Sequence, residues 1–168
     1  MVNWALLAGL LIPNIVGWLG TLTMIGQVDR KDGQAWCQLL KKPTWKPPTW
    51  IFGPMWTTVY FLMGYASYLV FETACGFTQQ AIIPLSLYGG QLILNWTWTP
   101  VFFGLHNLKL SFFHILAVDA AAVASTISFM FVNSTAGYLM LPYLGWLGVV
   151  SFLSYNVWQF NKDDITSA

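Results

Sequence analysis

The first 28 residues of the chain carry no charged side chain, and the run Val2–Gly26 within them is predominantly apolar. An α-helix needs about 20 such residues to cross the hydrocarbon core of a bilayer. The run lacks a basic N-terminal region and a small-residue cleavage site, so we expect a first membrane span rather than a signal peptide. Only 8% of the 168 residues are charged, whereas soluble proteins have about 25%. The sequence therefore predicts an integral membrane protein.

Four further apolar runs predict an all-α polytopic membrane protein, a bundle of five transmembrane helices in one domain, 1–168. We expect Thr49 to cap the second helix and residues 133–137 to form a turn before the fifth. Four and six spans are the alternatives. The predicted spans are about 2–26, 50–71, 82–105, 110–132 and 138–160, and the long loop is 27–49.

All seven cations fall on one side of this five-span arrangement, and an even number of spans would break the segregation. Cytosolic loops of membrane proteins carry an excess of Lys and Arg, so we expect the long loop and the C-terminus to face the cytosol. The two cysteines, Cys37 and Cys75, then lie on opposite sides and do not pair. The cations are Arg30, Lys31, Lys41, Lys42, Lys46, Lys109 and Lys162.

Several classes of function are not expected from these residues. Lys+Arg number 7 and Asp+Glu number 6, a balance that argues against nucleic acid as a partner. There is no nucleophile–base pair, no phosphate-binding loop and no cluster of His, Cys and carboxylates. We therefore expect no catalytic residue, no metal site and no cofactor.

Several motifs, in order and with matching spacing, resemble the translocator protein family, also called tryptophan-rich sensory proteins or peripheral-type benzodiazepine receptors. The resemblance covers roughly residues 1–160. It is carried by Lys42–Trp50 (KPTWKPPTW), Gly53–Thr57 (GPMWT), Met63–Tyr68 (MGYASY), Gln91 to Gly104 (QxxxNWxWxPxFFG), Pro142-Tyr143-x-x-Trp146 and Tyr155-x-x-Trp158.

The resemblance implies a five-helix bundle, expected as a homodimer, that binds cholesterol or other sterols, porphyrins such as haem, and benzodiazepine-type drugs. It implies the mitochondrial outer membrane, with the endoplasmic reticulum or plasma membrane as alternatives. The loop 29–49 would act as a lid over the pocket. Two alternatives to ligand binding or translocation stay open: photo-oxidative porphyrin breakdown in a Trp-lined pocket, and a scaffold in an outer-membrane complex.

The resemblance also assigns ligand contacts residue by residue. Leu110 stands where well-studied mammalian members have Trp, so stacking on drug-like ligands is expected to be weaker. The expected contacts are Thr21, Met24, Phe52, Gly53, Met55, Trp56, Asn95, Trp98, Leu110, Ala117, Trp146, Val150 and Leu153.

Polar residues within the spans need partners, because an unpaired polar group in hydrocarbon costs several kcal/mol. Gln91, Asn95 and Trp98 lie on one face of the third helix. An inter-helix hydrogen-bond clamp and a ligand-lining stripe are both open; we expect Gln91 to be structural. His114 and Asp119 are too far around the fourth helix to pair with each other. We expect structural contacts to other helices, and a ligand or gating role for Asp119 is the alternative.

The sterol-recognition stretch of the family is incomplete here. Its pattern is Leu or Val, then Tyr, then a basic residue. Leu153 and Tyr155 fit, but Gln159 occupies the basic position and Lys162 follows one residue too late. Such short motifs are weak patterns even when intact, so the departure lowers the expected affinity for sterols without excluding their binding.

Overall fold

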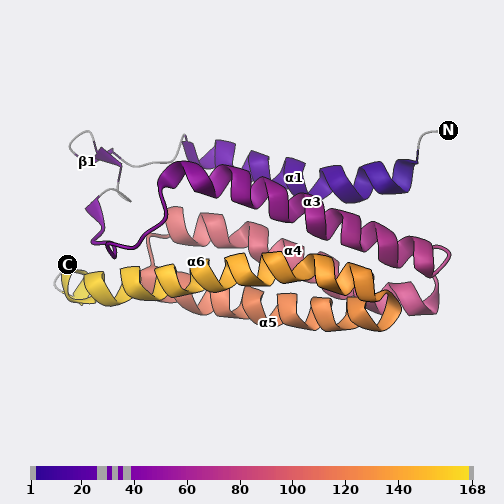
Figure 1. Ribbon diagram of the computed structural model, residues 1–168. Coiled ribbons are helices and arrows are strands. Elements are labelled where there is room, and N and C mark those ends of the chain that lie inside the picture. The colour runs from indigo at the N-terminus through magenta and orange to yellow at the C-terminus, as the bar shows by residue number, and fades with distance from the viewer. Residues whose placement is uncertain (1–2, 26–29, 32–33, 36–38, 167–168) are drawn as a thin grey trace.

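The computed structural model describes residues 3–25, 30–31, 34–35 and 39–166, and the side chains of 3–19 and 39–162. Within these ranges five long helices run along one axis (Figure 1). They are α1 (Trp4–Ile25), α3 (Thr49–Thr73), α4 (Gln79–Phe103), α5 (Leu108–Val132) and α6 (Ser134–Thr166). Two short antiparallel strands, β1 (Arg30–Lys31) and β2 (Gln34–Ala35), follow α1. The predicted bundle of five helices is confirmed.

The helices form a closed ring in the order α1, α3, α6, α5, α4 and back to α1. The core inside the ring is apolar, and Met63, Ile115, Met140 and Leu147 are at most 1% exposed. Large apolar side chains such as Phe131, 87% exposed, cover the outside instead. A surface of this kind suits lipid, because in a bilayer the apolar face of a helix needs no cover from protein.

Length and apolarity agree with membrane spans most clearly for the last two helices. The segments Leu108–Val132 and Ser134–Lys162 are each long and apolar enough to cross a membrane, and Trp4–Leu19 is a shorter apolar helix. Helices α3 and α4 have 25 residues each, about 38 Å of helix. They carry many Trp, Tyr and amide side chains, which lower their mean hydropathy, although Glu72 is the one charged residue in the two helices.

Two expectations about helix ends are wrong. Pro48, not Thr49, precedes the first turn of α3, and no side chain caps that turn. Thr49 is already helical, and its hydroxyl accepts a hydrogen bond of 3.3 Å from Lys46 Nζ. The turn expected at 133–137 is a single residue. Asn133 separates α5 from α6, and its Oδ1 accepts from the Ala136 amide at 3.1 Å, so the cap starts α6 at Ser134.

The two ends of the bundle differ in charge. One end, at the left of Figure 1, holds the two strands, the start of α3, the α4–α5 turn and the C-terminus. All seven cations belong to these segments or to residues 39–48, which lead into α3, so we call it the cation-rich end. The opposite end holds Glu72 and the exposed, unpaired Cys75. Cys37 lies outside the described residues.

Candidate functional site

The main aromatic cluster lies between α3 and α6. Phe52 and Trp56 are four residues apart, so both side chains lie on one face of α3. The ring of Trp146 on α6 contacts both, with centroids 5.3 Å from Phe52 and 6.4 Å from Trp56 in edge-to-face arrangements. Met55 is also partly buried against the core. We call Phe52, Trp56 and Trp146 the aromatic cluster, and the structure brings these three predicted ligand contacts together.

A buried polar network connects α4 to α6 within the bundle. Asn95 Nδ2 donates to the Tyr143 hydroxyl at 2.9 Å, and this hydroxyl donates to Gln91 Oε1 at 2.8 Å. Gln91 and Asn95 are one turn apart on α4, and Tyr143 is fully buried. We call these three residues the amide–tyrosine clamp. The clamp is one of the two alternatives that the sequence left open, and the Gln91 side chain takes part in it through Oε1.

Two buried N–H donors beside this arrangement have no hydrogen-bond partner. They are Gln91 Nε2 in the clamp and Trp146 Nε1 in the aromatic cluster. Trp146 and Tyr143 are three residues apart on α6, so the cluster and the clamp are neighbours along one helix face. A buried donor without an acceptor costs about 1–3 kcal/mol. The site therefore combines aromatic surface with N–H groups able to bind an acceptor oxygen.

Trp98 does not join the aromatic cluster. Its Nε1 donates to the backbone carbonyl of Ser111 on α5 at 3.1 Å, and its ring stacks on Phe102 at 5.1 Å. The indole therefore links α4 to α5. Sequence periodicity placed Trp98 on the face of Asn95, but it gave no indication of a backbone carbonyl as its partner.

The other predicted contacts are dispersed. Val150 is buried next to Trp146 and Leu153 is half-buried, both on α6. Leu110, 45% exposed, and Ala117 lie on the outer face of α5. Gly53 is exposed, and a Cβ there would meet open space. Thr21 and Met24 belong to α1, and their side chains lie outside the described part of the chain.

His114 and Asp119, within the span of α5, both contact neighbouring helices, as expected. The Ser151 hydroxyl on α6 donates to Asp119 Oδ2 at 2.7 Å. His114 Nε2 lies 2.9 Å from the Leu94 carbonyl and 3.3 Å from Thr97 Oγ1, both on α4. Among the described residues, no three His, Cys, Asp or Glu side chains are placed to hold a metal ion.

Residues 39–48 of the long loop are fixed to the end of α6. Asn161 accepts from the Lys41 amide and donates to the Lys41 carbonyl, both at 2.9 Å. Trp45 stacks on Phe152 with centroids 5.1 Å apart. These contacts place the loop across the cation-rich end of the bundle. Sequence reasoning missed Asn161, because a polar residue near a helix end is normally read as solvent-exposed.

The residues of the incomplete sterol stretch lie on several faces of α6. Leu153 and Gln159 are half-buried, whereas Tyr155 is 42% exposed. The Tyr155 ring packs on Phe112 and Trp158, with centroids 5.5 and 6.4 Å away. The stretch is therefore a surface feature at the cation-rich end, separate from the aromatic cluster.

Comparison with known proteins adds independent information. Residues 9–159 match the model of the TspO/MBR family. The chain is 41% identical over 152 residues to the translocator protein of Ovis aries, covering 90% of this chain and 87% of the sheep protein. It is 45% identical over 130 residues to the human translocator protein, covering 77% of each. Similarity reaches archaea: the tryptophan-rich protein TspO of Archaeoglobus fulgidus is 35% identical over 156 residues, 93% of this chain and 96% of its own.

Proposed function

The chain belongs to the TspO/MBR family, and from this membership we propose that it binds sterols such as cholesterol and tetrapyrroles such as haem or protoporphyrin inside its bundle. Relatives named translocator protein support a membrane translocator or receptor role. Binding of benzodiazepine-type drugs at the same place is part of the proposal. The protein acts in this account as a ligand-binding protein rather than an enzyme.

The observation that carries the proposal is the pair of buried, unpartnered N–H donors, Gln91 Nε2 and Trp146 Nε1. Each lacks an acceptor oxygen and is buried, and the Trp146 ring lies against Phe52 and Trp56. A sterol supplies a hydroxyl oxygen, and a tetrapyrrole supplies propionate oxygens. Ligand sites of mainly apolar lining with few polar groups have this composition.

The aromatic cluster supports the choice of a flat or rigid ligand. Aromatic rings gain about 0.5–1.5 kcal/mol from stacked or edge-to-face pairs beyond the area that they bury. Phe52, Trp56 and Trp146 already contact one another, so a ligand has to displace at least one of the rings. Phe52 and Trp56 lie on either side of Pro54 in α3. The proline removes one backbone hydrogen bond of the helix, which eases a movement of these rings.

The test is a titration of the reconstituted protein with protoporphyrin in the dark, in which quenching of the tryptophan fluorescence reports binding. Trp146→Phe removes the Nε1 donor but keeps an aromatic ring, and we expect a loss of affinity of about ten-fold, as for a hydrogen bond of about 1.4 kcal/mol. Trp4→Phe is the matched control, because Trp4 is 75% exposed at the opposite end of the bundle. Equal affinities for both variants would contradict the proposed site.

Illumination of the same samples separates binding from breakdown. If the protein binds porphyrin without reaction, the porphyrin absorption spectrum should change no more under illumination than it does in vesicles without protein. New absorption bands that appear only with the protein would favour photo-oxidative breakdown. A protein that binds neither porphyrin nor cholesterol would favour the scaffold alternative.

The membrane compartment and assembly are further parts of the proposal. We propose a homodimer in the mitochondrial outer membrane with the C-terminus in the cytosol, and the endoplasmic reticulum and plasma membrane are the alternatives. The charge difference between the two ends supports the orientation, because basic segments are retained on the cytosolic side. Localisation of the tagged full chain tests the compartment.

A further inference from the structure

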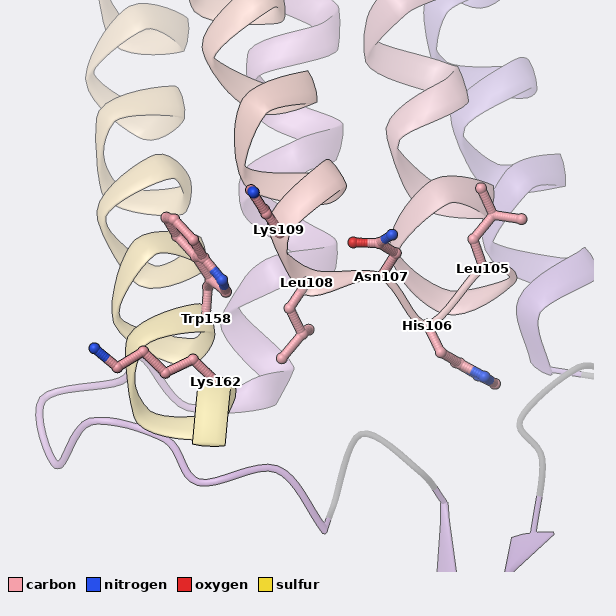
Figure 2. A pocket seen from close by; sticks show the side chains of 7 residues that line it. All are labelled: Leu105, His106, Asn107, Leu108, Lys109, Trp158 and Lys162. Atoms are coloured by element: carbon pink, nitrogen blue, oxygen red, sulfur yellow. The ribbon is translucent and has the colours of Figure 1, made fainter. Parts of the chain in front are cut away.

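A cavity apart from the aromatic cluster lies at the cation-rich end, between the α4–α5 turn and the end of α6. Its volume is about 460 Å³, and its lining includes Lys109, Lys162, His106 and Trp158. Figure 2 shows these side chains around the cavity, with Lys109 at the start of α5 and Trp158 and Lys162 on α6. Neither the cluster nor the clamp contributes a lining residue.

The charges around this cavity favour an anion. Lys109 is the second residue of α5, and the first turn of α5 contains no acidic residue. A helix N-terminus carries about half a positive charge, so a lysine there is in an unfavourable place unless an anion accompanies it. Lys162 adds a second cation from another helix. Asp163 and Asp164 follow it in the sequence, and their side chains lie outside the described residues.

The residues around the cavity are of the kinds that concentrate near lipid headgroups. Trp158 lines it, and the rings of Phe112, Tyr155 and Trp158 pack together next to it, with centroid separations of 5.5 Å from Phe112 to each of the others. Trp and Tyr concentrate at the membrane–water interface. Both lysines come from helix ends, where long cationic side chains extend toward the headgroups.

An exposed apolar surface continues from the cavity toward the middle of the bilayer. Leu110 is 45% exposed and Phe113 is 52% exposed, and both follow Lys109 on α5 within its first two turns. A lipid whose phosphate lies between the lysines has its acyl chains beside these residues. A soluble phosphate would make no use of this surface, so the combination points to a membrane lipid.

We propose that this cavity binds the headgroup of an anionic phospholipid, with Lys109 and Lys162 on the phosphate and Leu110 and Phe113 against the acyl chains. The α4–α5 turn shapes the cavity. His106 has a left-handed backbone with φ of 51°, which lets α4 reverse into α5 over residues 104–107. The site is independent of the ligand site in the bundle, and binding there anchors the α4–α5 turn to the cytosolic leaflet.

The test uses the full chain in vesicles of phosphatidylcholine that contain a minor fraction of spin-labelled phosphatidylserine. Electron spin resonance measures the immobilised fraction, and the same label on phosphatidylcholine gives the reference. We expect the protein to prefer phosphatidylserine, and the Lys109→Gln/Lys162→Gln double variant to lose this preference by about five-fold for each lysine. Lys46→Gln is the matched control, since Lys46 lies at the same end and does not line the cavity.

Each outcome decides the proposal. A preference unchanged in the double variant, or reduced equally by Lys46→Gln, would mean that general charge at this end attracts the lipid, and would overturn the site. Competition by millimolar inorganic phosphate that abolishes the preference would identify a free-phosphate site instead. Protoporphyrin affinity should be unchanged in the double variant, which also verifies folding. A loss of porphyrin binding would assign the cavity to tetrapyrrole propionates and overturn the lipid.

Discussion

Asn95 on α4 and Tyr143 on α6 are joined by a buried hydrogen bond of 2.9 Å, and the tyrosine hydroxyl in turn donates a hydrogen bond to Gln91 Oε1. The two helices contact one another in the interior of the ring through this network, although they are not neighbours around its circumference. The clamp therefore fixes the relative rotation of α4 and α6, and with it the position of Trp146.

Removal of the Tyr143 hydroxyl is expected to destabilise the bundle. Tyr143→Phe leaves Asn95 Nδ2 and Gln91 Oε1 without their partner. Hydrogen bonds inside membrane proteins contribute about 0.6 kcal/mol on average and about 1.7 kcal/mol at most, so we expect a loss of about 1–2 kcal/mol. Unfolding in mixed micelles of rising denaturing detergent measures it. Tyr138→Phe is the control, because Tyr138 is 65% exposed on the same helix. Equal stability of the two variants would show that the clamp contributes nothing.

The packing of α1 on α3 depends on two glycines. A Cβ on Gly9 would lie 2.9 Å from the carbonyl oxygen of Gly64, and a Cβ on Gly64 would collide with the backbone of Gly9. Overpacking of this kind costs about 1–3 kcal/mol, so Gly64→Ala should destabilise the protein. Gly148→Ala should be neutral or stabilise by up to about 1 kcal/mol, because a Cβ there meets nothing within 4 Å. Thermal denaturation in detergent compares the two, and a tolerated Gly64→Ala would mean that α1 and α3 are not in close contact.

The orientation of the chain is testable with its own cysteines. Cys75 is exposed at the end opposite the cations. In sealed, intact membranes an impermeant maleimide added from the cytosol should label Cys37 and leave Cys75 unmodified until the membrane is permeabilised. The Cys37→Ser and Cys75→Ser variants assign each signal. Labelling of both cysteines from one side before permeabilisation would contradict the five-span orientation.

The helices were predictable from the sequence because each one corresponds to a continuous apolar run of its own residues. An uncharged run such as Trp50–Phe71 is long enough to cross the bilayer and so predicts a span by itself. Helix α3 extends this run by one residue at its start and two at its end. The helix ends were less predictable. Asn is common both as a helix N-cap and in turns, so the sequence did not show which of the two Asn133 would be. The start of α6 at Ser134 was therefore missed.

The candidate site was only partly predictable, because the rotation of one helix relative to its neighbour cannot be inferred from a single sequence. Periodicity placed Gln91 and Asn95 on one face, but their partner Tyr143 is 48 positions beyond Asn95. Family resemblance selected Phe52, Trp56 and Trp146, which do meet. It also selected Trp98, whose indole instead bonds to the carbonyl of Ser111. Contacts to backbone atoms leave no signature in side-chain patterns.

The central claim is that one site in the bundle, built on the aromatic cluster and the buried donors of Gln91 and Trp146, takes both sterols and tetrapyrroles. The most direct measurement is competition between radiolabelled cholesterol and haem for the protein reconstituted in nanodiscs. A shared site predicts that haem displaces cholesterol completely, with a displacement curve that shifts in proportion to the cholesterol concentration, and that Trp146→Phe weakens both ligands while Trp4→Phe weakens neither. Simultaneous binding of both ligands, or cholesterol that haem leaves in place, would contradict the account.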